Sequence, residues 1–176
     1  GYIYTALGEY NLARENFNQA NALNPSDWTP EYEVSRIYFT EGEFAQAIQY
    51  AQQAVEDDPT SAVLHGNLGV MQAKNIQLED AVKSLSLAVQ GGLTENGNVV
   101  EGLPLSYQIR IVEIYSTYGL SLARLNRCSE AIPIFQTMLS VVRDNEIAVY
   151  NANVGLELCQ ANIDALPEGE EVTPTP

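Results

Sequence analysis

Apolar residues recur along most of the chain at intervals of three and four positions, which is the spacing of one face of an α-helix. One stripe consists of Ala13, Phe17, Ala20 and Leu23, and the next of Ala47, Ala51, Ala54 and Val55. Residues that break helices separate the stripes, among them Gly8, Pro25, Gly42 and Pro59. The pattern therefore predicts antiparallel pairs of helices joined by tight turns.

The stripes and breakers predict a helical chain without strands. We expect a helical stub at about 1–6, followed by helices near 9–23, 29–41, 44–57, 61–75, 77–90, 104–126, 129–143 and 146–163. Residues 91–103 should form a loop outside the helices, and Leu105 to Ile111 should lengthen the next helix by about two turns. The residues expected in the core are Ala13, Phe17, Ala20, Ala47, Ala54, Leu68, Gly69, Ala81, Ala88, Gly119, Ala131 and Phe135.

The pattern of the chain also repeats. Moving the sequence along itself by 34 positions places Tyr4 on Tyr38 and Gly8 on Gly42. The last full unit needs a step of 50 positions, for example from Gly69 to Gly119, so about 16 residues are inserted before it. Each unit then corresponds to one pair of helices.

The repeated residues resemble those of the tetratricopeptide repeat family over residues 1 to about 160. The positions that carry this resemblance are Leu68-Gly69, Tyr118-Gly119, Ala47, Ala81, Ala131, Ala20, Ala54, Ala88, Pro25 and Pro59. The chain departs from the motif at Gly1, which leaves the first unit without the start of its first helix, and at Met138, which replaces the later alanine.

The resemblance implies an all-α fold, a right-handed superhelical stack of antiparallel helix pairs. It places one repeat domain at 1–163, followed by an acidic tail rich in Pro and Thr at 164–176. Within the domain we expect units at about 1–27, 28–61, 62–93 and 112–145, an insertion at 94–111 and a capping helix at 146–163.

The charge balance excludes several classes of partner. The chain has 8 Lys and Arg against 23 Asp and Glu, a formal net charge of −15. Eight scattered cations cannot form the basic patch that nucleic acids or anionic membranes require, and no apolar run is long enough to span a bilayer. We therefore expect no nucleic-acid binding and no membrane insertion.

The chemistry of an enzyme is also missing from the sequence. His65 is the only histidine, and a metal site needs several ligands. A Ser–His–Asp arrangement needs an oriented base with a nucleophile beside it, and the sequence shows no such signature around His65. No glycine-rich loop follows a strand, which argues against a phosphate-binding motif. We expect no catalysis, no metal and no cofactor.

The resemblance implies that the first helix of each pair lines a concave groove. The positions that it assigns to peptide binding are Tyr2, Tyr32, Arg36, Phe39, Asn67, Val70, Lys74, Thr117, Leu120 and Arg124, with Thr5, Val63, Ser116, Asn153 and Leu156 beside them. Aromatic residues are common in binding surfaces, and three of the eight cations belong to this set. The set suits an extended or helical peptide with an acidic group; alternatively, these residues only pack and face solvent.

Some members of the family grip the C-terminal carboxylate of chaperones with Lys, Asn and Arg side chains. On this chain, that set would fall on Tyr32, Arg36, Asn67, Glu113 and Thr117. Only Asn67 matches, and Glu113 has the wrong sign, so the resemblance does not extend to the chaperone clamp.

Two functions remain open from the sequence. The first is a non-enzymatic scaffold that binds a protein or peptide segment in the groove. The second is a structural spacer or assembly subunit that contacts partners through its ends and loops. Tyr2, Ile3 and Tyr4 on an open first unit would favour self-association in this second case.

Cys128 and Cys159 bear on the compartment. Cys128 opens one predicted helix and Cys159 lies near the end of the next, and antiparallel helices bring such positions to the same edge. A disulfide is therefore compatible with the sequence, and two buried thiols are the alternative. A disulfide, the low lysine count and a Thr-Pro-Thr-Pro end that resembles linkers of bacterial surface proteins would favour an extracytoplasmic or cell-envelope location, which the sequence otherwise leaves open.

Overall fold

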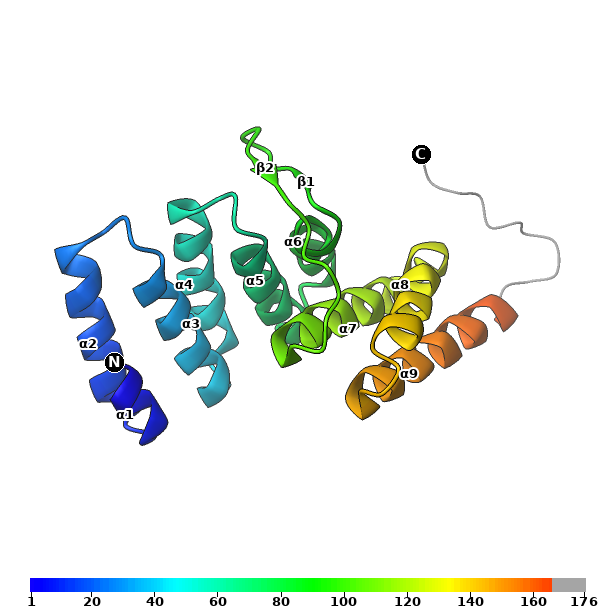
Figure 1. Cartoon of the computed structure of the whole chain (residues 1–176), viewed down its shortest axis with the longest axis horizontal. Coiled ribbons are helices and arrows are strands. Elements are labelled where there is room, and N and C mark those ends of the chain that lie inside the picture. Colours follow the sequence, from blue (N-terminus) through cyan, green and yellow to red (C-terminus); the bar gives the residue numbers. More distant parts are fainter. Residues whose placement is uncertain (166–176) are drawn as a thin grey trace. The chain divides into compact units, whose positions relative to one another are not determined.

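The computed structural model describes residues 1–165, and the predicted tail lies outside the described residues from 166 on. The chain divides into two compact units, with the boundary between Leu103 and Pro104. Each unit is an all-α array of paired helices (Figure 1).

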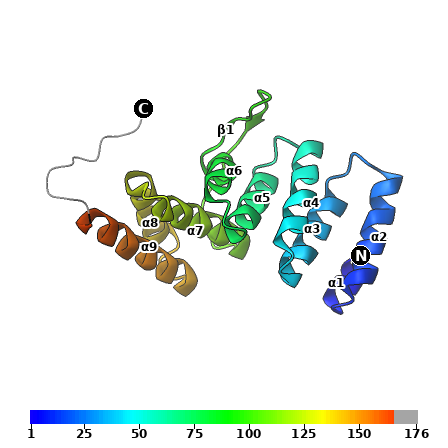
Figure 2. The same ribbon diagram turned by 180° about the vertical axis from the view of Figure 1, so that it is seen from behind.

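In unit 1, successive helices lie side by side in chain order, as both views show (Figures 1 and 2). They are α1 (Tyr2–Ala6), α2 (Tyr10–Leu23), α3 (Thr29–Glu41), α4 (Phe44–Asp57), α5 (Ala62–Lys74) and α6 (Leu78–Gln90). These bounds agree with the predicted helices to within one or two residues. The sequence is sufficient here because turn chemistry marks both ends of each helix: Asp27 accepts from the Thr29 N–H, and Gly42 ends α3 in the left-handed conformation.

The turn inside each helix pair requires a positive φ. Gly8 and Gly42 adopt it at φ 75° and 81°, where glycine has no steric cost. The next two equivalent turns use Ile76 at φ 63° and Asn126 at φ 60°. The repeat therefore keeps the turn geometry even where a β-branched residue occupies it.

The prediction of no strands is wrong for the insertion. β1 (Gly92–Leu93) pairs antiparallel with β2 (Val99–Val100), so a small hairpin follows α6 (Figure 1). The turn is closed by two backbone bonds, Thr94 N–H to Asn98 O and Gly97 N–H to Thr94 O, both 2.9 Å. Gly97 takes φ 80°, which suits a hairpin turn with a bulge.

The described part of unit 2, residues 104–165, contains three mutually packed helices. They are α7 (Ile109–Arg124), α8 (Cys128–Val141) and α9 (Glu146–Asp164). The predicted helical extension upstream of α7 is wrong, because the helix begins at Ile109 and not at 104. Helical spacing from Leu105 misled the prediction: Ile109 is 83% exposed and Gln108 is extended, so no packing continues the helix upstream.

The predicted core is buried with one exception. Small residues on the second helices, such as Ala47, Ala81 and Ala131, are fully buried, as are Phe135 and Ala88. Ala20, however, is exposed. The reason is that α1 has only five residues and covers only the beginning of α2.

Candidate binding sites

The predicted groove residues of α1 and α3 lie close together at the surface of unit 1. Tyr2 is 59% exposed and packs edge-on against Phe17, with ring centroids 5.3 Å apart. Tyr32 is half-buried, and the Arg36 guanidinium lies over its ring at 5.7 Å from the centroid. Burial raises the pKa of Tyr2, and the nearby Glu33 carboxylate adds to the shift.

Arg36 also lines a small cavity of about 90 Å³ formed by α1, α2 and α3, together with Thr5, Tyr10 and the carboxylate-bearing Glu33. Phe39, the last predicted groove residue of α3, is half-buried and packs against Phe44 with ring centroids 5.6 Å apart. Arg36 is thus an exposed cation that lies over the Tyr32 ring and borders a small cavity.

The predicted groove residues of α5 divide into two kinds. Asn67 and Val70 are buried, and Asn67 donates to Ser35 Oγ at 3.1 Å, which links α5 to α3. Lys74, in the last turn of the helix, is exposed. Val70 and Asn67 therefore hold the helices together, and Lys74 alone on α5 offers a charge. We define the aromatic–basic face of unit 1 as Tyr2, Tyr32, Arg36, Phe39 and Lys74.

In unit 2, α7 carries the corresponding positions. Thr117 and Leu120 are half-buried, and Arg124 is exposed in the last turn. Ser116 is buried, and its Oγ makes no hydrogen bond within residues 1–165. Arg124 is thus the exposed charged group among these predicted positions of α7.

Ion pairing separates the cations into two groups. Those that pair with carboxylates are Arg14 with Glu41, Arg110 with Glu113, Arg127 with Glu130 and Arg143 with Asp144. By contrast, no described carboxylate forms an ion pair with Arg36, Lys74 or Arg124 on the first helices, or with Lys83 on α6. In a chain of net charge −15, the first helices therefore present cations that the described residues leave unneutralised.

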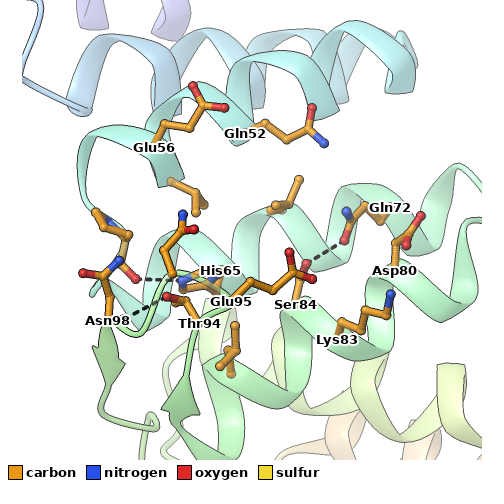
Figure 3. Close-up of a pocket in the computed structure, with 15 residues that line it drawn as sticks. Gln52, Glu56, His65, Gln72, Asp80, Lys83, Ser84, Thr94, Glu95 and Asn98 are labelled. Carbon is orange, nitrogen blue, oxygen red and sulfur yellow. Dashed lines mark hydrogen bonds between the residues drawn. The ribbon is translucent and has the colours of Figure 1, made fainter.

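A larger cleft of about 490 Å³ lies elsewhere on unit 1, and sequence reasoning missed it (Figure 3). It is lined by α4, α5, α6 and the hairpin, and its residues are Gln52, Val55, Glu56, Pro59, His65, Leu68, Gln72, Asp80, Lys83, Ser84, Leu87, Thr94, Glu95, Asn96 and Asn98. We call it the acidic cleft, because it carries Glu56, Asp80 and Glu95 against the single cation Lys83.

The acidic cleft and the aromatic–basic face lie on opposite sides of α5. His65 and Gln72 line the cleft, and each stands two positions before a predicted groove residue, Asn67 or Lys74. Two positions correspond to about 200° around a helix. The sequence does contain one signal for this site: Asn96-Gly97 lies between two short apolar segments, a pattern typical of the hairpin that forms one wall of the cleft.

In unit 2, the structure joins Cys128 and Cys159 in a disulfide, with 5.4 Å between the Cα atoms. Both residues are buried. Asn162 on the same helix as Cys159 donates to the Ala123 carbonyl at 3.0 Å. The C-terminal half of α9 is thus held to both α7 and α8.

Two kinds of site are not found in the part of the chain that the structure describes. No group of three or more His, Cys, Asp or Glu side chains lies within reach of one metal ion in residues 1–165. None of the helices there combines the length and the apolar composition of a membrane span.

Comparisons with known proteins give a family and a fold. A model of the tetratricopeptide repeat matches the sequence at residues 1–62 and 35–92. No curated protein matches the chain.

Three solved structures share the fold. The crystal structure of MamA has a TM-score of 0.66 at 15% identity, covering 92% of this chain and 86% of that one. A second MamA crystal structure has a TM-score of 0.66 at 16% sequence identity and covers 93% of this chain and 82% of that one. The third is the crystal structure of YrrB, described as a TPR protein with an unusual peptide-binding site. It has a TM-score of 0.67 at 22% sequence identity and covers 96% of this chain and 84% of that one. The fold is therefore an all-α stack of paired helices.

Proposed function

Because the chain belongs to the tetratricopeptide repeat family, we propose that it is a non-enzymatic scaffold whose first helices bind a protein or peptide segment bearing carboxylates. In unit 1, the segment lies on the aromatic–basic face. Helix pairs of this family generally bind proteins or peptides, and YrrB, which shares the fold, is described as having a peptide-binding site.

The unpaired cations carry the proposal. Arg36 and Lys74 form no ion pair with the described residues, although carboxylates outnumber cations almost threefold in the sequence. A surface cation that is left unneutralised in so acidic a chain can attract an acidic partner and exclude a basic one. Tyr32, beneath the Arg36 guanidinium, adds apolar contact area beside the charge.

The peptide chemistry follows from the geometry of this face. Arginine can hold a carboxylate through two parallel hydrogen bonds, and lysine acts as a point charge. The Asn67 Nδ2 donates to Ser35, while its Oδ1 accepts no hydrogen bond from residues 1–165. Because the whole side chain is buried, we assign it to positioning the helices and not to peptide contact. The proposed contacts are therefore Arg36, Lys74, Tyr32, Tyr2 and Phe39.

An array of short peptides with blocked ends, half with acidic and half with amide side chains, tests the proposal. We expect acidic peptides to bind the wild-type protein and Arg36→Glu with Lys74→Glu to weaken that binding about tenfold or more. The matched control is Lys83→Glu with Arg143→Glu, which changes the net charge equally but lies off the aromatic–basic face. Equal losses in both double variants, or none in the first, would contradict the proposal.

Exposed apolar residues favour a second candidate function, assembly through the ends of the helix array. Ile3 and Leu7, on and just after α1, are 76% and 69% exposed, and an exposed apolar patch invites pairing with another chain. If this is the function, sedimentation velocity should show association that increases with concentration and disappears in Ile3→Ser with Leu7→Ser. A single monomeric species over the whole range would exclude it.

A further inference from the structure

We propose that the acidic cleft of unit 1 is a second binding site, and that it takes an extended peptide segment bearing a lysine or arginine side chain. It is built from different residues and lies on the other side of α5 from the aromatic–basic face. The inference therefore goes beyond the proposed function and does not depend on it.

The cleft has the size and composition of a peptide site. Its volume of about 490 Å³ lies within the range of about 300–1,000 Å³ that is usual for ligand pockets. Val55, Leu68 and Leu87 supply apolar surface from three different helices. A short stretch of extended chain could cover this surface with alternate side chains while its backbone stays accessible.

The charges of the cleft select a cation. Glu56 comes from α4, Asp80 from α6 and Glu95 from the hairpin, so carboxylates stand on three sides (Figure 3). Lys83 is the only cation in the lining. A lysine or arginine side chain entering between these carboxylates would gain charge-assisted hydrogen bonds.

Buried polar groups provide a place for the peptide backbone. Gln72 is buried, and its Oε1 accepts from Ser84 Oγ at 2.8 Å. The Gln72 Nε2 makes no hydrogen bond within residues 1–165, so this donor is available to a peptide carbonyl. On the other side, His65 Nε2 bonds to the Pro59 carbonyl at 3.0 Å, which fixes that part of the wall.

The hairpin is held rigidly enough to act as a wall. Leu103 N–H donates to the Ala88 carbonyl at 2.8 Å, and Val100 is buried. A Cβ on Gly91 would lie 2.6 Å from the Val100 carbonyl, and one on Gly102 would lie 2.6 Å from the Val89 carbonyl. The two glycines thus let the hairpin base lie against the end of α6, which places Glu95 at the cleft.

The test uses the full chain and arrayed short peptides with blocked ends. Peptides of otherwise equal sequence carry arginine, lysine, glutamine or glutamate at the centre. Arginine and lysine peptides should bind, and Glu56→Gln with Glu95→Gln should weaken the best of them about tenfold or more, measured by fluorescence anisotropy. Both residues are exposed, so these near-isosteric changes should leave the thermal unfolding midpoint unchanged.

The matched control is Glu15→Gln with Glu157→Gln, which removes two exposed carboxylates outside the cleft and should leave the affinity unchanged. Arg36→Glu with Lys74→Glu should also leave the affinity for arginine peptides undiminished, because it alters only the other face. The proposal is overturned if no peptide binds, if glutamine or glutamate peptides bind as well as cationic ones, or if the control double variant loses as much affinity as the cleft variant.

Discussion

Gly119 of α7 lies directly against the ring of Phe135 of α8: a Cβ on Gly119 would come within 2.5 Å of Phe135 Cε1. Sixteen positions separate the two residues, and the same separation joins Gly69 to Leu85, where the added Cβ would lie 2.5 Å from Leu85 Cγ. The close approach within a helix pair is thus a property of the repeat, with a glycine on one helix making room for a large side chain on the other.

We expect Gly119→Ala to destabilise unit 2 by about 1–3 kcal/mol, because overpacking forces a rigid aromatic ring to move. Urea unfolding followed by circular dichroism measures the loss. Phe135→Leu should relieve part of it in the double variant, since a smaller side chain leaves space for the added methyl group. A Gly119→Ala variant as stable as the wild type would show that the register of α7 against α8 is wrong.

A substitution in the turn between α5 and α6 should stabilise the protein. Ile76 adopts φ 63° and is 81% exposed, so it has the steric cost of a left-handed conformation with little packing to offset it. Ile76→Gly should therefore raise the free energy of unfolding by about 1 kcal/mol, measured by urea unfolding. The reverse change in the equivalent turn of the preceding pair serves as the control: Gly42 adopts φ 81°, so Gly42→Ala should lower the free energy of unfolding by a similar amount.

The pH dependence of stability should reveal the buried carboxyl of Glu31. Burial raises its pKa above the usual value of 4.5, and the nearby Asp57 and Asp27 carboxylates add to the shift. A raised pKa in the folded state means that the protonated form is favoured there, so stability is lost as the pH rises from the unfolded pKa through the folded one.

Glu31→Gln removes this titration and should make the protein more stable than the wild type at neutral pH. The difference in unfolding free energy between variant and wild type should grow as the pH rises above the usual pKa of 4.5, and level off above the raised pKa of the folded state. Glu15→Gln, an exposed carboxyl on α2, should show no such growth. A constant difference between Glu31→Gln and the wild type would mean that Glu31 titrates normally.

The disulfide between Cys128 and Cys159 should stabilise the end of α9. It closes a loop with a sequence separation of 31, so its loss in Cys128→Ala with Cys159→Ala should cost about 2–4 kcal/mol. Alkylation of freshly isolated protein without reductant, followed by mass spectrometry, should label no cysteine. Two labelled cysteines would show that the bond is absent under those conditions and would remove its support for an oxidising compartment.

The helix pairs could be predicted from the sequence because each is a local pattern: an apolar stripe, small residues at fixed offsets and a turn that needs Gly, Asn or Pro. Errors arose where local pattern and packing disagree. Ala20 has the right position in the stripe, but the short α1 leaves it uncovered. Leu105 and Ile109 have helical spacing, yet the helix begins only at Ile109.

The candidate sites were harder to predict because they depend on which polar groups are already bonded. Asn67 occupies a predicted groove position but is buried, and its Nδ2 is bonded to Ser35, which no spacing indicates. The acidic cleft joins residues from α4, α5, α6 and the hairpin, so it depends on where the hairpin lies relative to these three helices. Such a site becomes visible only when the segments are placed in space.

The central claim is that the aromatic–basic face binds an acidic peptide segment, and backbone amide NMR tests it most directly. The acidic peptide that binds best on the array is added to isotope-labelled protein. We predict chemical-shift changes concentrated on α3 and α5 around Arg36 and Lys74, reduced in the Arg36→Glu, Lys74→Glu variant and unchanged in the Lys83→Glu, Arg143→Glu control. Shifts confined to α1 and its exposed Ile3 and Leu7, or shifts that persist in the first variant, would contradict the claim.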